Sequence, residues 1–196
     1  MQTEAEWEYA CRAGSTGNYC FGNDETLFGE YAWYTDNSEG VTHNIGTKKP
    51  NGWGLYDMHG NVYEWCQDWY GDYPGIALFD PIGATSGEYR VLRGGRFSGN
   101  AEFQRSANRG RGSVDHTDDT RGFRLIYEPV YLNSIGMKFN KIPPGHFTMG
   151  SPDGIVQFPI DSGEIPAEEI GRSPDEIPHI VTLTKHIYMQ TTEVTQ

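Results

Sequence analysis

The sequence predicts a single, loop-rich α+β domain with short twisted antiparallel strands and few helices. Of its 196 residues, 25 are glycine and 13% are aromatic. This composition favours loops anchored by aromatic clusters over long helices. Only one short segment has the pattern of a capped helix, and two runs, Tyr89–Leu92 and 122–127, have the composition of short strands. A chain of this length is sufficient for one domain with its own core.

The expected helix begins after Thr3. Thr3 and Glu6 form the Ser/Thr-x-x-Glu pattern of a capping box, and Gly14 ends the helical pattern. The chain has three cysteines without CxxC or zinc-finger spacing, so at least one thiol is free. We interpret Cys11 as a small buried apolar residue of this helix. The expected buried face consists of Trp7, Ala10 and Cys11.

Charge and hydropathy exclude several classes of function. A formal net charge of -12 argues against nonspecific binding to nucleic acid or to anionic membranes. The mean hydropathy is -0.63 and no long apolar run is present, which excludes a membrane-spanning segment. The opening stretch MQTEAEWEYA is acidic and amphipathic and does not have the pattern of a signal peptide, so the expectation is a soluble chain of unassigned compartment.

The stretch NGWGLYDMHGNVYEW, residues 51–65, predicts a rigid, packed loop that leads into a strand. Asp57 and Glu64 flank a turn, so their carboxylates and several backbone carbonyls can converge on one point. Converging oxygens suit a hard cation, above all calcium. The same residues allow a simpler interpretation. In it, Asp57 accepts backbone N–H groups of the turn and Glu64 pairs with an arginine.

The segments GLYDMHGNVYEW, RVLRGG and RGFRL resemble characteristic segments of the formylglycine-generating-enzyme family, also called the sulfatase-modifying-factor domain. The resemblance runs from Thr3 to Ile126 and implies a C-type-lectin-like fold. It also implies a structural calcium, and a second calcium site in which Trp33 stands at the side-chain position. The ligands implied for the first calcium are the side chains of Asp57 and Glu64 and the carbonyls of Gly60 and Val62.

The enzymes of the family that this chain resembles are copper-dependent oxidases, which convert a cysteine of a substrate protein to formylglycine. They use two cysteine thiolates, the ligands that Cu(I) prefers. The matching positions here are Gly99 and Gln104. The resemblance therefore implies a noncatalytic domain, or pseudoenzyme. The alternatives are an oxidoreductase that uses one of the three cysteines, or an accessory domain of one, and an inert fragment of a tandem protein.

The polar segment 96–119 is the expected binding surface. Domains of this family that lack the two cysteines resemble a C-type-lectin-like scaffold in which the equivalent segment is a surface for binding. Guanidinium and amide donors suit a polar or anionic small molecule, or a protein. The expected contacts are Arg96, Asn100, Gln104 and Arg111. A scaffold role, in which an arginine pairs internally with acids, competes for these positions and is the expectation for Arg93, Arg105, Arg109, Arg121 and Arg124.

The end of the chain resembles the beginning of a family domain. NSIGMKFNKIPPGHFTMG (133–150) and IPHIVTLTKHIYMQTTEVTQ (177–196) are similar to its opening strands, and the acidic stretch 151–178 between them predicts an exposed loop. Residues 1–128 then supply the central and closing parts and residues 129–196 the opening strands. A circular permutant and a tandem fragment are both compatible with this order. We favour one composite domain because an isolated strand pair cannot bury its apolar face.

Overall fold

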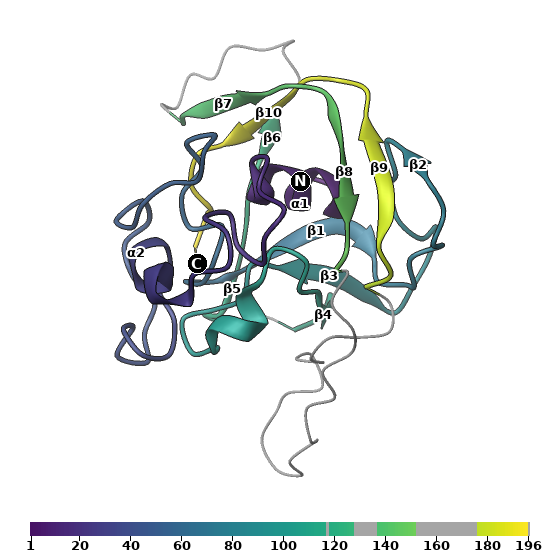
Figure 1. The fold of residues 1–196 in the computed structure, drawn as a ribbon. Helices are drawn as coiled ribbons and strands as arrows, with labels where there is room; N and C mark the ends of the chain where they lie inside the picture. Colours follow the sequence, from purple (N-terminus) through teal and green to yellow (C-terminus); the bar gives the residue numbers. More distant parts are fainter. Residues whose placement is uncertain (117, 128–136, 152–175, 196) are drawn as a thin grey trace.

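The computed structural model describes residues 1–116, 118–127, 137–151 and 176–195. Short strands and long loops surround one central helix, as the composition predicts (Figure 1). The helices are α1 (Glu4–Arg12) and α2 (Phe28–Tyr31), with 3-10 turns η1 (Glu25–Leu27) and η2 (Ala101–Gln104). The strands are β1 (Tyr63–Trp69), β2 (Leu78–Phe79), β3 (Tyr89–Arg93), β4 (Gly110–Ser113), β5 (Arg121–Phe123), β6 (Ile126–Tyr127), β7 (Phe139–Ile142), β8 (Gly145–Met149), β9 (His179–Leu183) and β10 (Ile187–Gln190).

The described strands form three small sheets. The largest has the order β4-β3-β1-β5, and the other two have the orders β6-β10-β7 and β2-β9-β8. Most neighbouring strands are antiparallel, as predicted, but β1–β5 and β2–β9 are parallel. β5 pairs with β1 at the register Tyr63↔Arg121. The chain between these two strands includes β3 and β4 of the same sheet. A parallel pair needs such a long crossover.

Helix α1 forms where its sequence predicts. The Thr3 hydroxyl accepts the Glu6 N–H at 3.1 Å and the Glu6 carboxylate accepts the Thr3 N–H at 2.7 Å, which completes the capping box. Ala13, in the left-handed region at φ 47°, ends the helix one residue before the predicted Gly14. Trp7, Ala10 and Cys11 are fully buried, which confirms the predicted apolar face.

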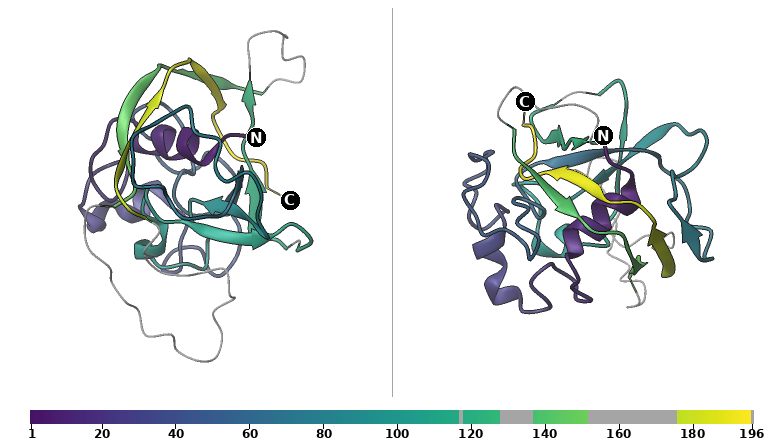
Figure 2. Two further views of the ribbon diagram at one scale, coloured as in Figure 1. Left: turned by 90° about the vertical axis from the view of Figure 1, so that its right-hand side faces the viewer. Right: turned by 90° about the horizontal axis from the view of Figure 1, so that it is seen from above.

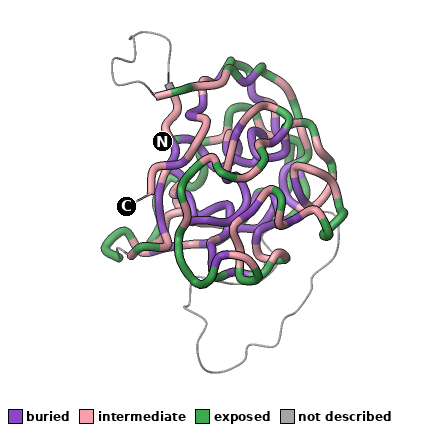
Figure 3. Tube along the Cα trace, turned by 90° about the vertical axis from the view of Figure 1, so that its left-hand side faces the viewer, coloured by how far each residue is buried: buried purple, intermediate pink, exposed green. Residues whose placement is uncertain are grey.

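The strands at the end of the chain pack onto the rest of the molecule (Figure 2). β10 pairs with β6 at Met189↔Ile126 and with β7 on its other side. Met189 and Val181 are fully buried in the same hydrophobic cluster as Trp7 and Val91. Figure 3 shows buried residues at the interior of the tube. Both parts of the chain therefore contribute to one core. Residues 133–136 of the opening-strand segment and 152–175 of the expected loop lie outside the described residues.

A second, smaller cluster anchors the polar region that follows α1. Tyr19 and Phe28 are almost fully buried, with ring centroids 5.0 Å apart, and Phe21 stacks on Tyr19 at 5.1 Å. These contacts are the predicted aromatic anchors of the loops. The short helix α2, which carries Phe28, was not predicted, because a single helical turn is too short to show a periodic pattern.

Candidate functional site

A buried ion pair lies at the centre of the predicted site. β1 directs Glu64 into the core, and Arg124 follows β5; both side chains are fully buried. Arg124 Nη2 lies 2.6 Å from Glu64 Oε1, and Arg124 Nε donates to Oε2 at 3.1 Å. Trp7 Nε1 also donates to Oε2, at 3.0 Å. Each oxygen of Glu64 thus accepts a hydrogen bond from the arginine.

Two further carboxyl groups meet beside this ion pair. Asp57, at φ 56°, accepts the Gly46 N–H at 2.6 Å, and Glu193 accepts a hydrogen bond from the Asn61 amide at 2.8 Å. Burial raises the pKa of Asp57, and burial together with the charge of Asp57 raises the pKa of Glu193 well above its usual range. Burial and the neighbouring negative charge therefore both disfavour the ionised form of Glu193.

The four residues expected to hold calcium lie in one buried turn. A β-carbon at Gly60 would come 2.1 Å from the Trp33 carbonyl oxygen, so the turn requires glycine there. The contacts of Asp57 and Glu64 are those of the simpler interpretation, a backbone N–H and an arginine. Within the described ranges, no three His, Cys, Asp or Glu side chains form a group that could hold a metal ion. A calcium ion at this turn would therefore need carbonyl oxygens as well as carboxylates.

The position expected for the second calcium is occupied by a stack of side chains. The Trp33 ring lies parallel to the His43 ring at a centroid distance of 3.7 Å. Lys48 Nζ lies 3.8 Å above the same indole. The indole of Trp33 therefore makes a ring stack and a cation–π contact at this position.

The loop after β3 brings three of the singled-out residues together. Gln104 is fully buried, and its amide nitrogen donates to the carbonyl oxygens of Arg96 and Gly99, both at 2.9 Å. A β-carbon at Gly99 would lie 3.4 Å from the same nitrogen. Gln104 therefore supports the loop from beneath. Asn100 is exposed and Arg96 is half-buried, so these two residues face the surface of the loop.

Arg111, the fourth expected contact, interacts with different residues. It lies on β4, and its guanidinium carbon is 5.1 Å from the ring centroid of Tyr89 and 5.6 Å from that of Tyr70. The side chain packs against aromatic rings, while Arg96 and Asn100 belong to the 96–104 loop.

The arginines assigned to the scaffold all pair with acids, which confirms that prediction. The carboxylates come from α1, β1, the polar loop before β5 and the segment before β9. Sequence reasoning did not single out Glu193 or Glu8, because nothing local in the sequence indicates their long-range partners. The pairs are Arg93 with Glu8, Arg105 with Glu176, Arg109 with Glu4, Arg121 with Asp118 and Arg124 with Glu64.

The cysteines are poorly suited to nucleophilic or redox chemistry. Cys11 is fully buried beside His59, with Sγ and Nε2 3.8 Å apart. Burial raises the pKa of Cys11 to about 12 and lowers the pKa of His59 to about 4. His59 Nε2 accepts the Cys20 N–H, and Nδ1 bonds the Gln104 carbonyl oxygen. The imidazole is therefore not an available base, and burial also raises the pKa of Cys20 and Cys66.

These features define a loop-rich α+β domain in which buried arginine–carboxylate pairs hold long loops in place. A family profile described as the sulfatase-modifying factor enzyme 1-like domain matches residues 1–129. The chain belongs to this family, as its motifs suggest. Neither helix in the described part of the chain is long and apolar enough to cross a membrane.

Curated relatives carry similar sequences. The serine/threonine-protein kinase pkn1 of Chlamydia pneumoniae is 39% identical over 128 residues, which cover 63% of this chain and 20% of the kinase. The formylglycine-generating enzyme of Streptomyces coelicolor is 34% identical over 141 residues, covering 63% of this chain and 45% of the enzyme. The chain spans less than half the length of either relative.

Solved structures show the same fold. Treponema denticola variable protein 1 is 42% identical, with a TM-score of 0.61 over 63% of this chain and 45% of that one. PvdO from Pseudomonas aeruginosa is 35% identical, with a TM-score of 0.55 over 63% of this chain and 50% of that one.

Proposed function

We propose that the chain is a noncatalytic binding module of this family, with a C-type-lectin-like scaffold. The main support for this proposal comes from the two positions that match the catalytic cysteines of the family. Gly99 and Gln104 are joined by a hydrogen bond of 2.9 Å and offer no sulfur ligand. The three thiols of the chain supply no substitute, because burial raises the pKa of Cys11, Cys20 and Cys66. The second candidate function is that of an oxidoreductase, which the likeness to formylglycine-generating enzymes favours.

The proposed recognition surface is the loop that begins at Arg96. Arg96 and Asn100 present guanidinium and amide groups, which suit a polar or anionic small molecule or an acidic patch on a protein. Gln104 contributes by holding the loop in shape, since its amide donates to two loop carbonyls. The net charge of -12 makes nucleic acid an unsuitable ligand.

The oxidase alternative makes a separate prediction. We expect no aldehyde on a cysteine-bearing peptide that is incubated with the protein, Cu(I) and oxygen, because no thiolate pair is available to bind copper. Mass spectrometry of the peptide measures the conversion, and the same peptide with serine in place of cysteine is the control. Conversion of the cysteine peptide above this control would establish the oxidase and overturn the noncatalytic proposal.

We further propose that calcium stabilises the fold at the turn of Asp57, Gly60, Val62 and Glu64. Asp57 and Glu193 fit a hard cation, because both are buried carboxyl groups and Glu193 Oε2 has no hydrogen-bond partner among the described residues. Glu64 could serve as a ligand only by loosening its contact with Arg124. Both carboxyl groups must be ionised to bind calcium and their pKa values are raised, so calcium binding weakens as pH falls.

Calcium is expected to raise the melting temperature by several degrees. A free calcium concentration of 100 times Kd contributes about 2.7 kcal/mol. Differential scanning calorimetry with calcium and with a chelator measures the shift, which should be larger at pH 8 than at pH 6. Asp57→Asn should abolish the shift, whereas the exposed control Asp115→Asn should retain it. An equal shift in wild type and Asp57→Asn would show that calcium binds elsewhere.

The order of the strands supports a proposal about the architecture. We propose that residues 129–196 supply the opening strands of the family domain, as in a circular permutant. The pairing of β10 with β6 and β7 favours this arrangement over a tandem fragment.

A further inference from the structure

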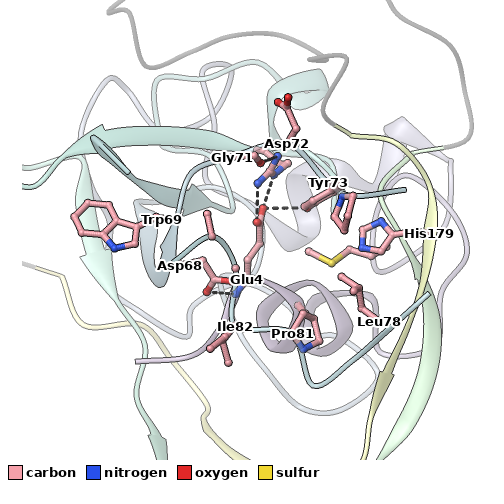
Figure 4. A pocket seen from close by; sticks show the side chains of 16 residues that line it. Glu4, Asp68, Trp69, Gly71, Asp72, Tyr73, Leu78, Pro81, Ile82 and His179 are labelled. Atoms are coloured by element: carbon pink, nitrogen blue, oxygen red, sulfur yellow. Dashed lines mark hydrogen bonds and ion pairs between the residues drawn. The ribbon is translucent and has the colours of Figure 1, made fainter. Parts of the chain in front are cut away.

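A cavity of about 360 Å³ opens beside the first turn of α1, lined by the loop that follows β1 and by β2 and β9 (Figure 4). It shares none of its lining residues with the 96–104 loop. Its volume lies in the range of small-molecule sites, and such sites combine apolar walls with a few polar groups. The apolar and aromatic walls include Trp69, Tyr73, Leu78, Pro81, Ile82 and Met149.

Asp68 is a buried acid of this cavity, and no ion pair joins it to a cation among the described residues. Asp68 is 4% exposed. Among the described residues, its carboxylate accepts one hydrogen bond, from the Glu4 N–H at 2.8 Å. Glu4, the neighbouring carboxylate, is bound by Arg109 at 2.6 and 2.8 Å and by the Tyr73 hydroxyl at 3.0 Å. In Figure 4 Asp68 lies near Trp69 and Ile82, and Tyr73 and His179 lie at the other end. Asp68 therefore presents a buried carboxylate to an apolar space.

The surroundings of Asp68 favour an added positive charge. Burial and the negative charges of Glu4 and Glu6 raise the pKa of Asp68 to about 7, against the lowering effects of the Glu4 N–H and Arg109. A cation in the cavity would stabilise the ionised carboxylate. The rings of Trp69 and Tyr73 contribute apolar wall, and each already carries a guanidinium, of Arg90 at 3.5 Å and of Arg109 at 4.0 Å from the ring centroid.

We propose that this cavity binds an alkylammonium group carried on an apolar or aromatic body, with Asp68 as the counter-ion. A bound anion would lie against Asp68, and a neutral apolar molecule would leave the carboxylate without a partner. The ammonium offers up to three donors, and the apolar walls accept the body of the ligand. A free amine and a lysine side chain of a polypeptide share this chemistry. The inference does not depend on the function proposed for the 96–104 loop.

The test compares three probes of one shape by isothermal titration calorimetry at pH 8. Phenethylamine is expected to bind, and 2-phenylethanol and phenylacetate to bind at least tenfold more weakly. A blocked peptide of sequence Leu-Lys-Leu forms the fourth arm, and the tighter of the two amines identifies the source of the ligand. Absence of binding by both amines, or equal affinity for phenethylamine and 2-phenylethanol, would overturn the proposal.

Variants separate the buried carboxylate from general electrostatics. Asp68→Asn keeps an oxygen for the Glu4 N–H but removes the charge, and it should weaken amine binding about tenfold. Asp72→Asn, which removes an exposed acid at the rim of the same cavity, should leave the affinity within twofold. Unchanged amine affinity in Asp68→Asn would refute the assignment.

The pH dependence of the wild-type protein gives a readout that needs no variant. Amine affinity should rise between pH 6 and pH 8 as Asp68 ionises, while the affinity for 2-phenylethanol should stay level. The other charged or titratable groups that line the cavity are Glu4, Asp72, Tyr73, Arg109 and His179, and the charge of Glu6 also acts on Asp68. Loss of the pH dependence in Asp68→Asn would assign it to Asp68, and an amine affinity that does not change with pH would contradict the proposal.

Discussion

Replacing Arg124 by methionine is expected to lower the free energy of unfolding by about 3–5 kcal/mol, because it leaves a buried carboxylate without its partner. Both oxygens of the Glu64 carboxylate lose a hydrogen bond in this variant, because Arg124 binds each of them. Arg124 also lies 3.8 Å from Glu193, so the variant removes the cation that faces this second buried carboxyl group as well. Urea denaturation at pH 7, followed by tryptophan fluorescence, measures the change.

The surface pair Lys49–Glu30 provides the matched control. Its ion pair is 2.5 Å long but its side chains are 60% and 47% exposed, so Lys49→Met should cost less than about 1 kcal/mol. For Arg124→Met, a loss below about 1 kcal/mol at pH 7 would mean that the buried pair contributes little to stability.

Local patterns in the sequence predicted local structure well. The spacing of Thr3 and Glu6 identified α1, because a capping box needs only residues three positions apart. The composition predicted loops anchored by rings, and Tyr19 and Phe28 are such anchors.

Partners far apart in the chain were less accessible to prediction. Glu193 lies 132 positions from Asn61, with which it shares a hydrogen bond, and no short motif encodes that pairing. Gln104 was expected to face a ligand, but its amide is buried beneath the loop, since the orientation of a side chain in a 3-10 turn depends on packing that the sequence does not display. The parallel pairs β1–β5 and β2–β9 likewise depend on tertiary contacts.

Met189→Ala is expected to destabilise the whole molecule by about 2–5 kcal/mol, the usual cost of a cavity at a fully buried methionine. Met189 lies on β10, whereas the five tryptophans all lie within residues 1–69. If the strands at the end of the chain complete one composite domain, Met189→Ala should lower the midpoint of the unfolding transition seen by tryptophan fluorescence. The midpoint seen by far-ultraviolet circular dichroism should decrease by the same amount.

The same measurement decides between the two explanations for the order of the strands. The control Ile180→Ala, at a residue that is 46% exposed on β9, should change stability by less than about 1 kcal/mol. In a tandem fragment, the residues 1–127 would unfold independently of β10, and the tryptophan midpoint would stay in place while Met189→Ala weakened the remaining strands. Coincident midpoints require that the core that includes Trp7 and Met189 forms in a single cooperative step.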